Sequence, residues 1–307
     1  MHHPLQVLKH YWGYDGFRPG QAEVIDSILS GHDTLALMPT GGGKSITFQV
    51  PALANSGICL VISPLVALMK DQVKNLQKRG ILSAFISSEM PHWEILQQLD
   101  NCILGDYKFL YISPERISSE LFQEKLKTLS RKVNLLVVDE AHCISQWGND
   151  FRRDYRLIAD IRDAIPHVQV IAVTASATAA VVADICEQLH FRKGYRIFKT
   201  SFERKNLSFV VRKTDNKLKE ICHILSAVPG SAVIYSRTRK GVEEYAGKLR
   251  AAGISAEYFH AGLDPVLKTE RQADWVKGFT RVLVATNAFG MGIDKGERAC
   301  GDPHGVS

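Results

Sequence analysis

The sequence predicts an α/β fold with parallel sheets and helices on both faces. Short apolar runs rich in valine and isoleucine alternate with amphipathic stretches along most of the 307 residues, and such alternation is typical of parallel strands joined by helical crossovers. A chain of this length holds about two domains at ~150 residues each. Hydrophobic residues make up 45% of the chain and charged residues 23%, so a packed core is expected and disorder is not.

Two series of elements divide the chain, and we expect a first domain at residues 1–200, a linker at 201–215 and a second domain at 216–307. In the first series the expected strands are 34–38, 58–62, 109–112, 135–138 and 168–173, and the expected helices are 21–30, 65–79, 91–104 and 118–129. In the second series the expected strands are 232–235, 257–259 and 282–285, and the expected helices are 240–252 and 265–278.

Composition limits the possible classes of protein. The six cysteines form no Cys-x-x-Cys pair, so we expect neither a zinc site nor a redox motif, and a reducing, cytoplasmic setting. No segment reaches the ~20 apolar residues of a membrane span, and no signal peptide is predicted. The net charge of +6 permits a nucleic-acid partner but fits an ordinary soluble enzyme almost equally well.

A glycine-rich loop follows the first expected strand and leads into a helix. Its sequence is PTGGGKS, residues 39–45, and glycines allow backbone N–H groups to face phosphate oxygens. Lys44 would contact the β- and γ-phosphates of ATP, and Ser45 would offer a hydroxyl to Mg²⁺. The alternative, a turn that happens to precede a lysine, is less favoured because paired carboxylates occur downstream. The predicted ATP-binding residues of this loop are Thr40, Gly41, Gly42, Gly43, Lys44 and Ser45.

Paired carboxylates end another expected strand, since four apolar residues lead directly into Asp139 and Glu140. We expect Asp139 to anchor Mg²⁺ and Glu140 to act as the general base that orients and deprotonates water, with Lys44 completing the catalytic set. The loop that follows mixes aromatic, polar and basic residues, a pattern suited to nucleic acid. Its candidate contacts are Gln146, Trp147, Phe151 and Arg152.

With these motifs in place, the chain resembles a superfamily-two helicase of the DEAH type and, more narrowly, a RecQ-family DNA helicase, from about residue 8 to residue 295. The resemblance implies two RecA-like domains, ATP with Mg²⁺, single-stranded and partly duplex DNA as partner, and 3′–5′ translocation in repair and recombination. It also implies that Tyr14 stacks on adenine, with Arg18 and Gln21 at the edge of the base.

Further stretches resemble helicase elements that contact DNA or couple it to hydrolysis. The resemblance assigns such roles to Ser63, Lys70, Thr174, Ser236, Arg237 and Thr286, besides the loop residues already named. The sequence departs from the family pattern at three positions. Ser176 stands where threonine is usual, Asn149 where histidine is usual, and Arg153 where proline is usual.

The resemblance stops at Lys295, and residues 296–307 have no apolar strand pattern. We therefore expect a second domain that is incomplete at its C-terminus and lacks the arginine-finger motif. The expected behaviour is ATP and DNA binding with weak hydrolysis and unwinding. The alternatives are a hydrolysis-deficient ATP- and DNA-binding fragment and a DEAH-box RNA helicase, whereas a metabolic P-loop kinase leaves the second domain unexplained.

Overall fold

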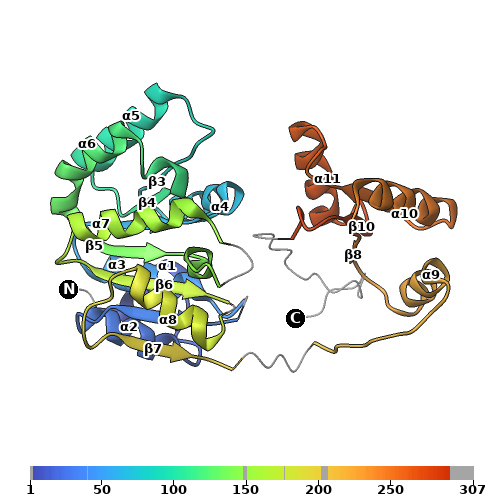
Figure 1. Cartoon of the computed structure of the whole chain (residues 1–307), viewed down its shortest axis with the longest axis horizontal. Coiled ribbons are helices and arrows are strands. Elements are labelled where there is room, and N and C mark those ends of the chain that lie inside the picture. The colour runs from blue at the N-terminus through green and yellow to red at the C-terminus, as the bar shows by residue number, and fades with distance from the viewer. Residues whose placement is uncertain (1–2, 40, 148–150, 176, 202–206, 291–307) are drawn as a thin grey trace. The chain divides into compact units, whose positions relative to one another are not determined.

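The computed structural model describes residues 3–39, 41–147, 151–175, 177–201 and 207–290. The chain divides into two compact units, Met1–Lys205 and Asn206–Ser307, whose elements are labelled in Figure 1. Thr40 and the centre of the predicted DNA loop, residues 148–150, lie outside the described residues, as do Ser176 and everything after residue 290.

The first unit is built on a seven-stranded parallel sheet with the order β3-β4-β2-β5-β6-β1-β7. Its strands are β1 (Thr34–Leu37), β2 (Ile58–Ile62), β3 (Ser83–Ile86), β4 (Phe109–Ile112), β5 (Val133–Val138), β6 (Gln169–Thr174) and β7 (Arg196–Lys199). The five strands expected from the sequence are present. The two edge strands, β3 and β7, were not predicted. Strand β7 is largely exposed and carries lysine and arginine, so it lacks the apolar signal of a buried strand.

Helices cover both faces of this sheet, as predicted (Figure 1). They are α1 (Pro4–Trp12), α2 (Gln21–Leu29), α3 (Lys44–Ala54), α4 (Val66–Gln77), α5 (His92–Leu104), α6 (Glu120–Leu129), α7 (Ile158–Ala164) and α8 (Ala179–Gln188). Successive residues of β2 point to opposite faces. Leu60 and Ile62 join a core with α5 to α8, and Cys59 and Val61 join a second core with α1 to α4.

Short 3₁₀ helices complete the connections of this unit: η1 (Pro114–Arg116), η2 (Ser130–Lys132), η3 (Ala141–Ile144) and η4 (Arg153–Leu157). Because all strands are parallel, their carboxyl ends lie at one edge of the sheet. In the register, Leu37 of β1 lies beside Thr174 of β6, and Ile62 of β2 lies beside Val138 of β5. This edge is where open α/β sheets bind ligands.

The second unit has a three-stranded parallel sheet, among the described residues, with the order β8-β10-β9. Its strands are β8 (Ala232–Tyr235), β9 (Ala256–Phe259) and β10 (Val282–Ala285), and its helices are α9 (Lys217–Ala227), α10 (Arg239–Ala251) and α11 (Pro265–Lys277). The sequence analysis placed every element except α9. Val282 and Val284 of β10 join a core with α9 and α10. A smaller core on the other face forms around Trp275, whose indole Nε1 donates to the carbonyl of Ala232 at 3.1 Å.

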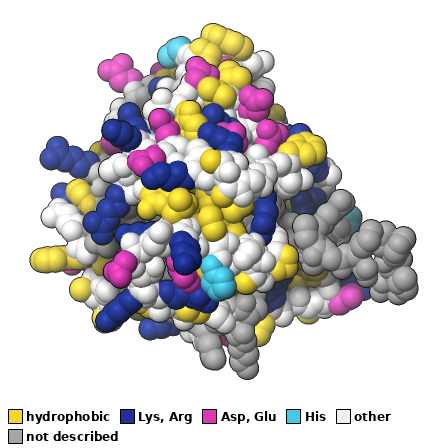
Figure 2. Space-filling model, turned by 90° about the vertical axis from the view of Figure 1, so that its right-hand side faces the viewer, with side chains coloured by type: hydrophobic (Ala, Val, Ile, Leu, Met, Phe, Trp, Pro, Cys, Tyr) yellow, Lys and Arg dark blue, Asp and Glu magenta, His cyan; other side chains and the backbone are white. Residues whose placement is uncertain are grey.

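The surface carries both signs of charge. Figure 2 shows one face, on which lysine and arginine side chains are scattered among hydrophobic and acidic ones instead of forming one block. Within the described ranges, no helix is long and apolar enough to cross a membrane.

Candidate functional site

The loop between β1 and α3 is held by two side chains that precede or begin α2. Arg18 Nη1 donates to the carbonyl of Gly41 at 3.0 Å, and Gln21 Nε2 donates to the carbonyl of Gly43 at 3.0 Å. Gly43 has a φ of +77°, and a Cβ there would collide with Gln21 Nε2. Only glycine therefore suits this position.

A pocket of about 440 Å³ lies beside this loop, and Tyr14, Arg18, Gln21 and Gly43 are among its lining residues. The structure thus brings the residues predicted to bind adenine to one place. Tyr14 is 53% exposed, so its ring is accessible for stacking. Gln21 differs from expectation, because its Oε1 accepts from Arg18 N at 2.9 Å and its Nε2 is bonded to the loop. Both polar atoms of its amide are occupied within the protein.

Asp139 follows β5, and hydrogen bonds fix both its backbone and its carboxylate. Its N–H donates to the carbonyl of Ile62 at 2.9 Å, Ser63 Oγ donates to its Oδ2 at 3.2 Å, and the Glu140 N–H donates to its Oδ1 at 3.0 Å. Burial, reinforced by the Glu140 carboxylate, raises the pKa of Asp139 to about 6, although Lys44 and the two hydrogen bonds oppose the rise. Removing this carboxylate from water has a cost that the two hydrogen bonds and Lys44 offset in part, and a bound cation would offset it further.

Glu140 lies between a lysine and a histidine. Lys44 Nζ at the start of α3 is 3.4 Å from Glu140 Oε1, and His142 Nδ1 is 3.4 Å from Glu140 Oε2. The same His142 nitrogen is 2.8 Å from Thr174 Oγ1 at the end of β6. Glu140 itself has a φ of 46°, a left-handed conformation that is unfavourable for a residue with a side chain.

The donor set fits Mg²⁺ bound together with a nucleotide. Asp139 offers a buried carboxylate, and Ser45 lies in the first turn of α3, next to Lys44. Mg²⁺ in nucleotide sites is typically held by one or two protein oxygens, while phosphates and waters complete the octahedron. Accordingly, the described residues contain no group of three or more His, Cys, Asp or Glu side chains that would form an all-protein metal cage.

The loop from Ser145 to Arg152 is anchored at both ends. Ser145 Oγ donates to Asp184 Oδ2 of α8 at 2.6 Å. At the other end, Arg152 N donates to the carbonyl of Cys143 at 2.8 Å, and its Nη1 donates to the carbonyl of Pro64 at 3.2 Å. These bonds fix the base of the loop against the elements that follow β2 and β5.

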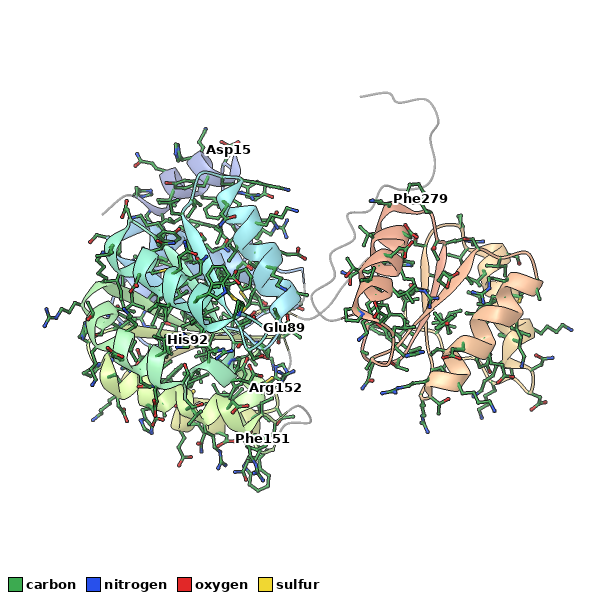
Figure 3. All side chains as sticks on the ribbon, turned by 90° about the horizontal axis from the view of Figure 1, so that it is seen from above. Asp15, Glu89, His92, Phe151, Arg152 and Phe279 are labelled. Carbon is green, nitrogen blue, oxygen red and sulfur yellow. The ribbon has the colours of Figure 1, made fainter. Side chains whose placement is uncertain are left out.

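The aromatic side chains of this loop are accessible. Trp147 is 77% exposed, and Phe151 lies at the periphery of the first unit in Figure 3, next to Arg152. The guanidinium carbon of Arg156 is 5.3 Å from the centroid of the Phe151 ring, and the same guanidinium faces the side-chain amide of Gln146. Trp147 is too exposed to be part of the hydrophobic core.

Three other predicted DNA residues of the first unit lie in different environments. Lys70 is exposed on α4, where it is 3.5 Å from Glu89 Oε2. Thr174 is fully buried and contacts His142. Ser63 differs from expectation, since it is 1% exposed, donates to Asp139, and lies before α4, which begins at Val66. The reason is Pro64, which favours an extended conformation for the residue before it.

In the second unit the predicted residues gather at the carboxyl ends of two paired strands. Ser236 and Arg237 follow β8, and Thr286 follows β10. Ser236 N donates to the carbonyl of Ala285 at 2.9 Å, which joins the two strand ends. Arg237 is exposed, whereas Thr286 is buried.

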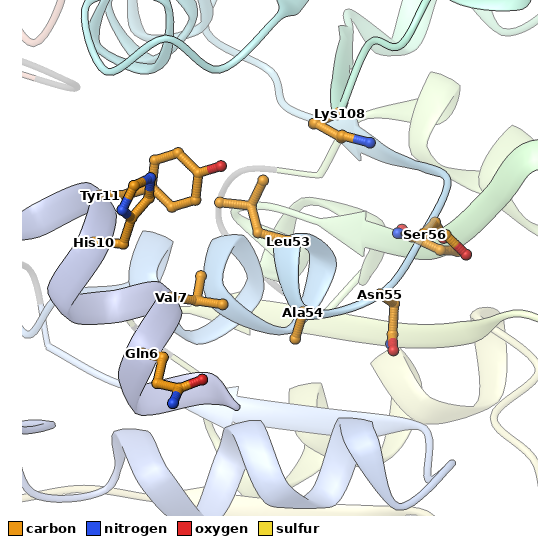
Figure 4. A pocket seen from close by; sticks show the side chains of 10 residues that line it. Gln6, Val7, His10, Tyr11, Leu53, Ala54, Asn55, Ser56 and Lys108 are labelled. Atoms are coloured by element: carbon orange, nitrogen blue, oxygen red, sulfur yellow. Dashed lines mark hydrogen bonds between the residues drawn. The ribbon is translucent and has the colours of Figure 1, made fainter. Parts of the chain in front are cut away.

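A larger cavity, about 850 Å³, lies away from these groups (Figure 4). Val7 and Tyr11 of α1 line it, together with Leu53 near the end of α3 and Lys108 just before β4. These positions are at the amino ends of the strands, on the opposite edge of the sheet from Asp139. This cavity is therefore not a candidate for the nucleotide site, although it is larger than the pocket beside Tyr14.

Two residues of the site were missed by the sequence analysis. His142 bridges Glu140 and Thr174, and its place two residues after Glu140 in the D-E-A-H run was a signal that could have found it. Tyr155 donates from its hydroxyl to the carbonyl of Asp139 at 2.9 Å. No sequence pattern distinguishes Tyr155 from an ordinary core aromatic.

Comparison with known proteins agrees with this architecture. Residues 18–185 match the DEAD/DEAH box helicase family, and residues 216–299 match the helicase conserved C-terminal domain. Among solved structures, the DUF1998 helicase MrfA bound to DNA has a TM-score of 0.74 at 16% identity, covering 97% of this chain and 46% of that one. Mycobacterium smegmatis helicase Lhr, bound to single-stranded DNA and AMP-PNP, has a TM-score of 0.70 at 18% identity, with 96% and 43% covered. These likenesses confirm the RecA-like fold.

Curated relatives narrow the assignment. The ATP-dependent DNA helicase RecQ of Bacillus subtilis is 42% identical over 298 residues, which cover 96% of this chain and 50% of that protein. RecQ of Haemophilus influenzae is 39% identical, with 95% and 47% covered. The chain spans about half the length of these relatives. It belongs to the DEAD/DEAH box helicase family and, within that family, to the RecQ group.

Proposed function

We propose that this chain is an ATP-dependent DNA helicase of the RecQ type, which couples ATP hydrolysis to 3′–5′ translocation on single-stranded DNA and to unwinding of partly duplex DNA. One observation carries the proposal. Lys44, Asp139 and Glu140 converge at one sheet edge, and the chain continues from them directly into the anchored loop that exposes Trp147. The proposed ATP site is therefore continuous along the chain with a loop that offers a stacking surface for bases.

The proposed chemistry is hydrolysis of the γ-phosphate. Lys44 and the N–H groups of Gly41 to Gly43 hold the phosphates, and the start of α3 adds its dipole. Ser45 and Asp139 hold Mg²⁺, which neutralises charge on the phosphate oxygens when bound. Glu140 orients water and accepts its proton. Tyr14 stacks on adenine, while Arg18 and Gln21 keep the loop in shape and line the same pocket.

The proposed DNA contacts come from both units. Trp147 and Phe151 offer rings on which bases stack, and Gln146, Arg152 and Lys70 offer polar contacts beside them. Thr174 couples the strand-contacting region to hydrolysis through His142, and Ser63 acts through Asp139. In the second unit, Ser236, Arg237 and Thr286 supply the remaining contacts. A DNA substrate places the protein with the nucleoid of a bacterium or in the nucleus of a eukaryote.

ATP hydrolysis by the purified chain, with and without single-stranded DNA, tests the proposal. Single-stranded DNA is expected to raise the rate of turnover, and Glu140→Gln is expected to abolish turnover while ATP still binds, because the amide keeps the shape but cannot accept the proton. ATP binding without any DNA-stimulated turnover would instead support a binding module that does not hydrolyse. Greater stimulation by RNA than by DNA would favour an RNA helicase.

A further inference from the structure

Tyr155 is a buried residue whose hydroxyl is directed at the catalytic edge. It lies in η4, its side chain is fully buried, and its hydroxyl donates to the carbonyl oxygen of Asp139 at 2.9 Å. A carbonyl can only accept, so the tyrosine must be the donor. Burial raises the pKa of the Tyr155 hydroxyl well above its usual range, and the group therefore keeps its proton at every pH at which the protein works.

The carbonyl that Tyr155 contacts belongs to the peptide that joins Asp139 to Glu140. At the other end of this peptide, the Glu140 N–H donates to Asp139 Oδ1 at 3.0 Å. Side chains thus fix both polar ends of one peptide plane. Glu140 has φ 46° and ψ 47°, a conformation that costs roughly 1–2 kcal/mol for a residue with a Cβ. Such a conformation persists only where neighbouring bonds hold it.

The hydrogen bond also closes a loop in the chain. Tyr155 and Asp139 are 16 residues apart, and the segment between them contains the whole loop from Ser145 to Arg152. Tyr155 N donates to the carbonyl of Arg152 at 3.1 Å, and Arg152 N donates to the carbonyl of Cys143 at 2.8 Å. Tyr155 therefore joins the end of the loop to the Asp139–Glu140 peptide by two hydrogen bonds. Its N–H contacts the carbonyl of Arg152, and its hydroxyl contacts the carbonyl of Asp139.

From this geometry we propose that Tyr155 is the positioning residue for Glu140, which it holds through the Asp139–Glu140 peptide and ties to the exit of the loop carrying Trp147. The inference rests on the proposed function, in which Glu140 activates water. Tyr155 does not touch the reacting atoms. Its hydroxyl fixes the direction of the carboxylate, so its loss affects the rate of the chemical step and leaves nucleotide and DNA binding intact.

The test is Tyr155→Phe in the full chain, because phenylalanine keeps the buried ring and removes only the hydroxyl. The matched control is Ser27→Ala, which also removes a buried hydroxyl, bonded to Thr34 Oγ1 at 2.9 Å, at the opposite edge of the sheet. Turnover is measured with saturating single-stranded DNA and normalised to nucleotide-binding sites titrated with a fluorescent ATP analogue. This normalisation removes any loss of folded protein.

For Tyr155→Phe, kcat is expected to fall about 3- to 10-fold, the range that one hydrogen bond supports, with KM for ATP and Kd for DNA unchanged. Ser27→Ala should keep the wild-type kcat. An unchanged normalised kcat in Tyr155→Phe, or an equal fall in both variants, would overturn the inference. Glu140→Gln distinguishes a failure of the proposed function from a failure of the inference about Tyr155. Wild-type turnover in Glu140→Gln would refute the proposed function itself, whatever the result for Tyr155→Phe.

Discussion

Both units of this chain are built on parallel sheets, and they differ in how deeply the described strands of each sheet are buried. In the first unit, β2 and β5 lie inside a seven-stranded sheet and are almost entirely buried. In the second, β8 lies at an edge of a three-stranded sheet, and its Tyr235 is 61% exposed. The buried strands of the first unit therefore give a firm support to the left-handed conformation of Glu140, the proposed general base. The second offers polar residues at its strand ends on a smaller core.

The segment before α9 sharpens this contrast. Phe209 is 95% exposed and Val211 is 94% exposed, although the run they belong to is as apolar as a strand. In the first unit, runs of comparable character are buried in the sheet. Apolar sequence by itself does not guarantee burial, which also depends on neighbours that supply a second surface.

The largest expected effect is a difference in ATPase rate between a lysine substitution in the first unit and one in the second. Lys44→Ala removes the charge proposed to contact the phosphates, and it should lower DNA-stimulated turnover by at least about 100-fold, the scale of a lost electrostatic contact to a transition state. The control is Lys248→Ala in α10 of the second unit, where Lys248 forms a surface ion pair with Glu244. A steady-state ATPase assay measures both variants, and equal rates in Lys44→Ala and wild type would show that the phosphate-loop assignment is wrong.

The buried carboxylate of Asp139 predicts a stability effect of the next size. Its folded pKa of about 6 exceeds the ordinary value of 3.8, so the folded state binds the proton more tightly than the unfolded state. Stability should then fall as the pH rises from about 4 to about 6 and stay level above that range. Asp139→Asn removes this loss, and its free energy of unfolding at pH 8 should exceed that of wild type by up to about 3 kcal/mol.

Urea unfolding of the full chain at pH 4 and pH 8 measures this difference, which should vanish at the lower pH. Asp33→Asn is the matched control. Asp33 is also fully buried, but it is paired with Arg162 at 3.1 Å and Arg192 at 2.9 Å, so losing its charge should destabilise the unit. If Asp139→Asn also lowered the free energy of unfolding at pH 8, the buried carboxylate would not destabilise the folded state and the prediction would be wrong.

A smaller effect concerns the aromatic loop. Trp147→Ala removes an exposed stacking surface, and the affinity for single-stranded DNA should weaken by about 1–3 kcal/mol. Trp93→Ala on α5 is the control, since Trp93 is 66% exposed but lies outside the proposed DNA contacts. Fluorescence anisotropy of a labelled oligonucleotide gives both affinities, and equal losses would indicate non-specific contact with indoles.

The smallest expected effect compares the two sheets directly. Amide hydrogens of β8 should exchange at least about tenfold faster than those of β2, a difference of 1.4 kcal/mol in opening free energy. The reason is that β8 pairs with β10 alone in the part of the chain that the structure describes, whereas β2 pairs with both β4 and β5. Hydrogen exchange followed by mass spectrometry measures this, and equal protection would mean that the two units open as one.

Sequence patterns identified most elements because each depends on local rules. Apolar runs marked the buried strands, and the glycines and lysine of residues 39–45 marked the phosphate loop. The carboxylates Asp139 and Glu140 stood out because four apolar residues precede them. Edge strands such as β7 were missed, since a strand with an exposed face carries polar residues. For the same reason, the helix α9, with only Leu225 fully buried, gave a weak pattern.

The sequence by itself determined the parallel α/β class and the family to which its motifs point, and it predicted a phosphate loop, since these follow from spacing along the chain. Only the tertiary structure decided which polar groups meet. It turned Ser63 inward to Asp139, occupied both polar atoms of Gln21 with its neighbours, and placed Tyr155 on the peptide before Glu140. These contacts join residues that are distant in sequence, and a hydrogen bond depends on distance and direction in space, which no local pattern encodes.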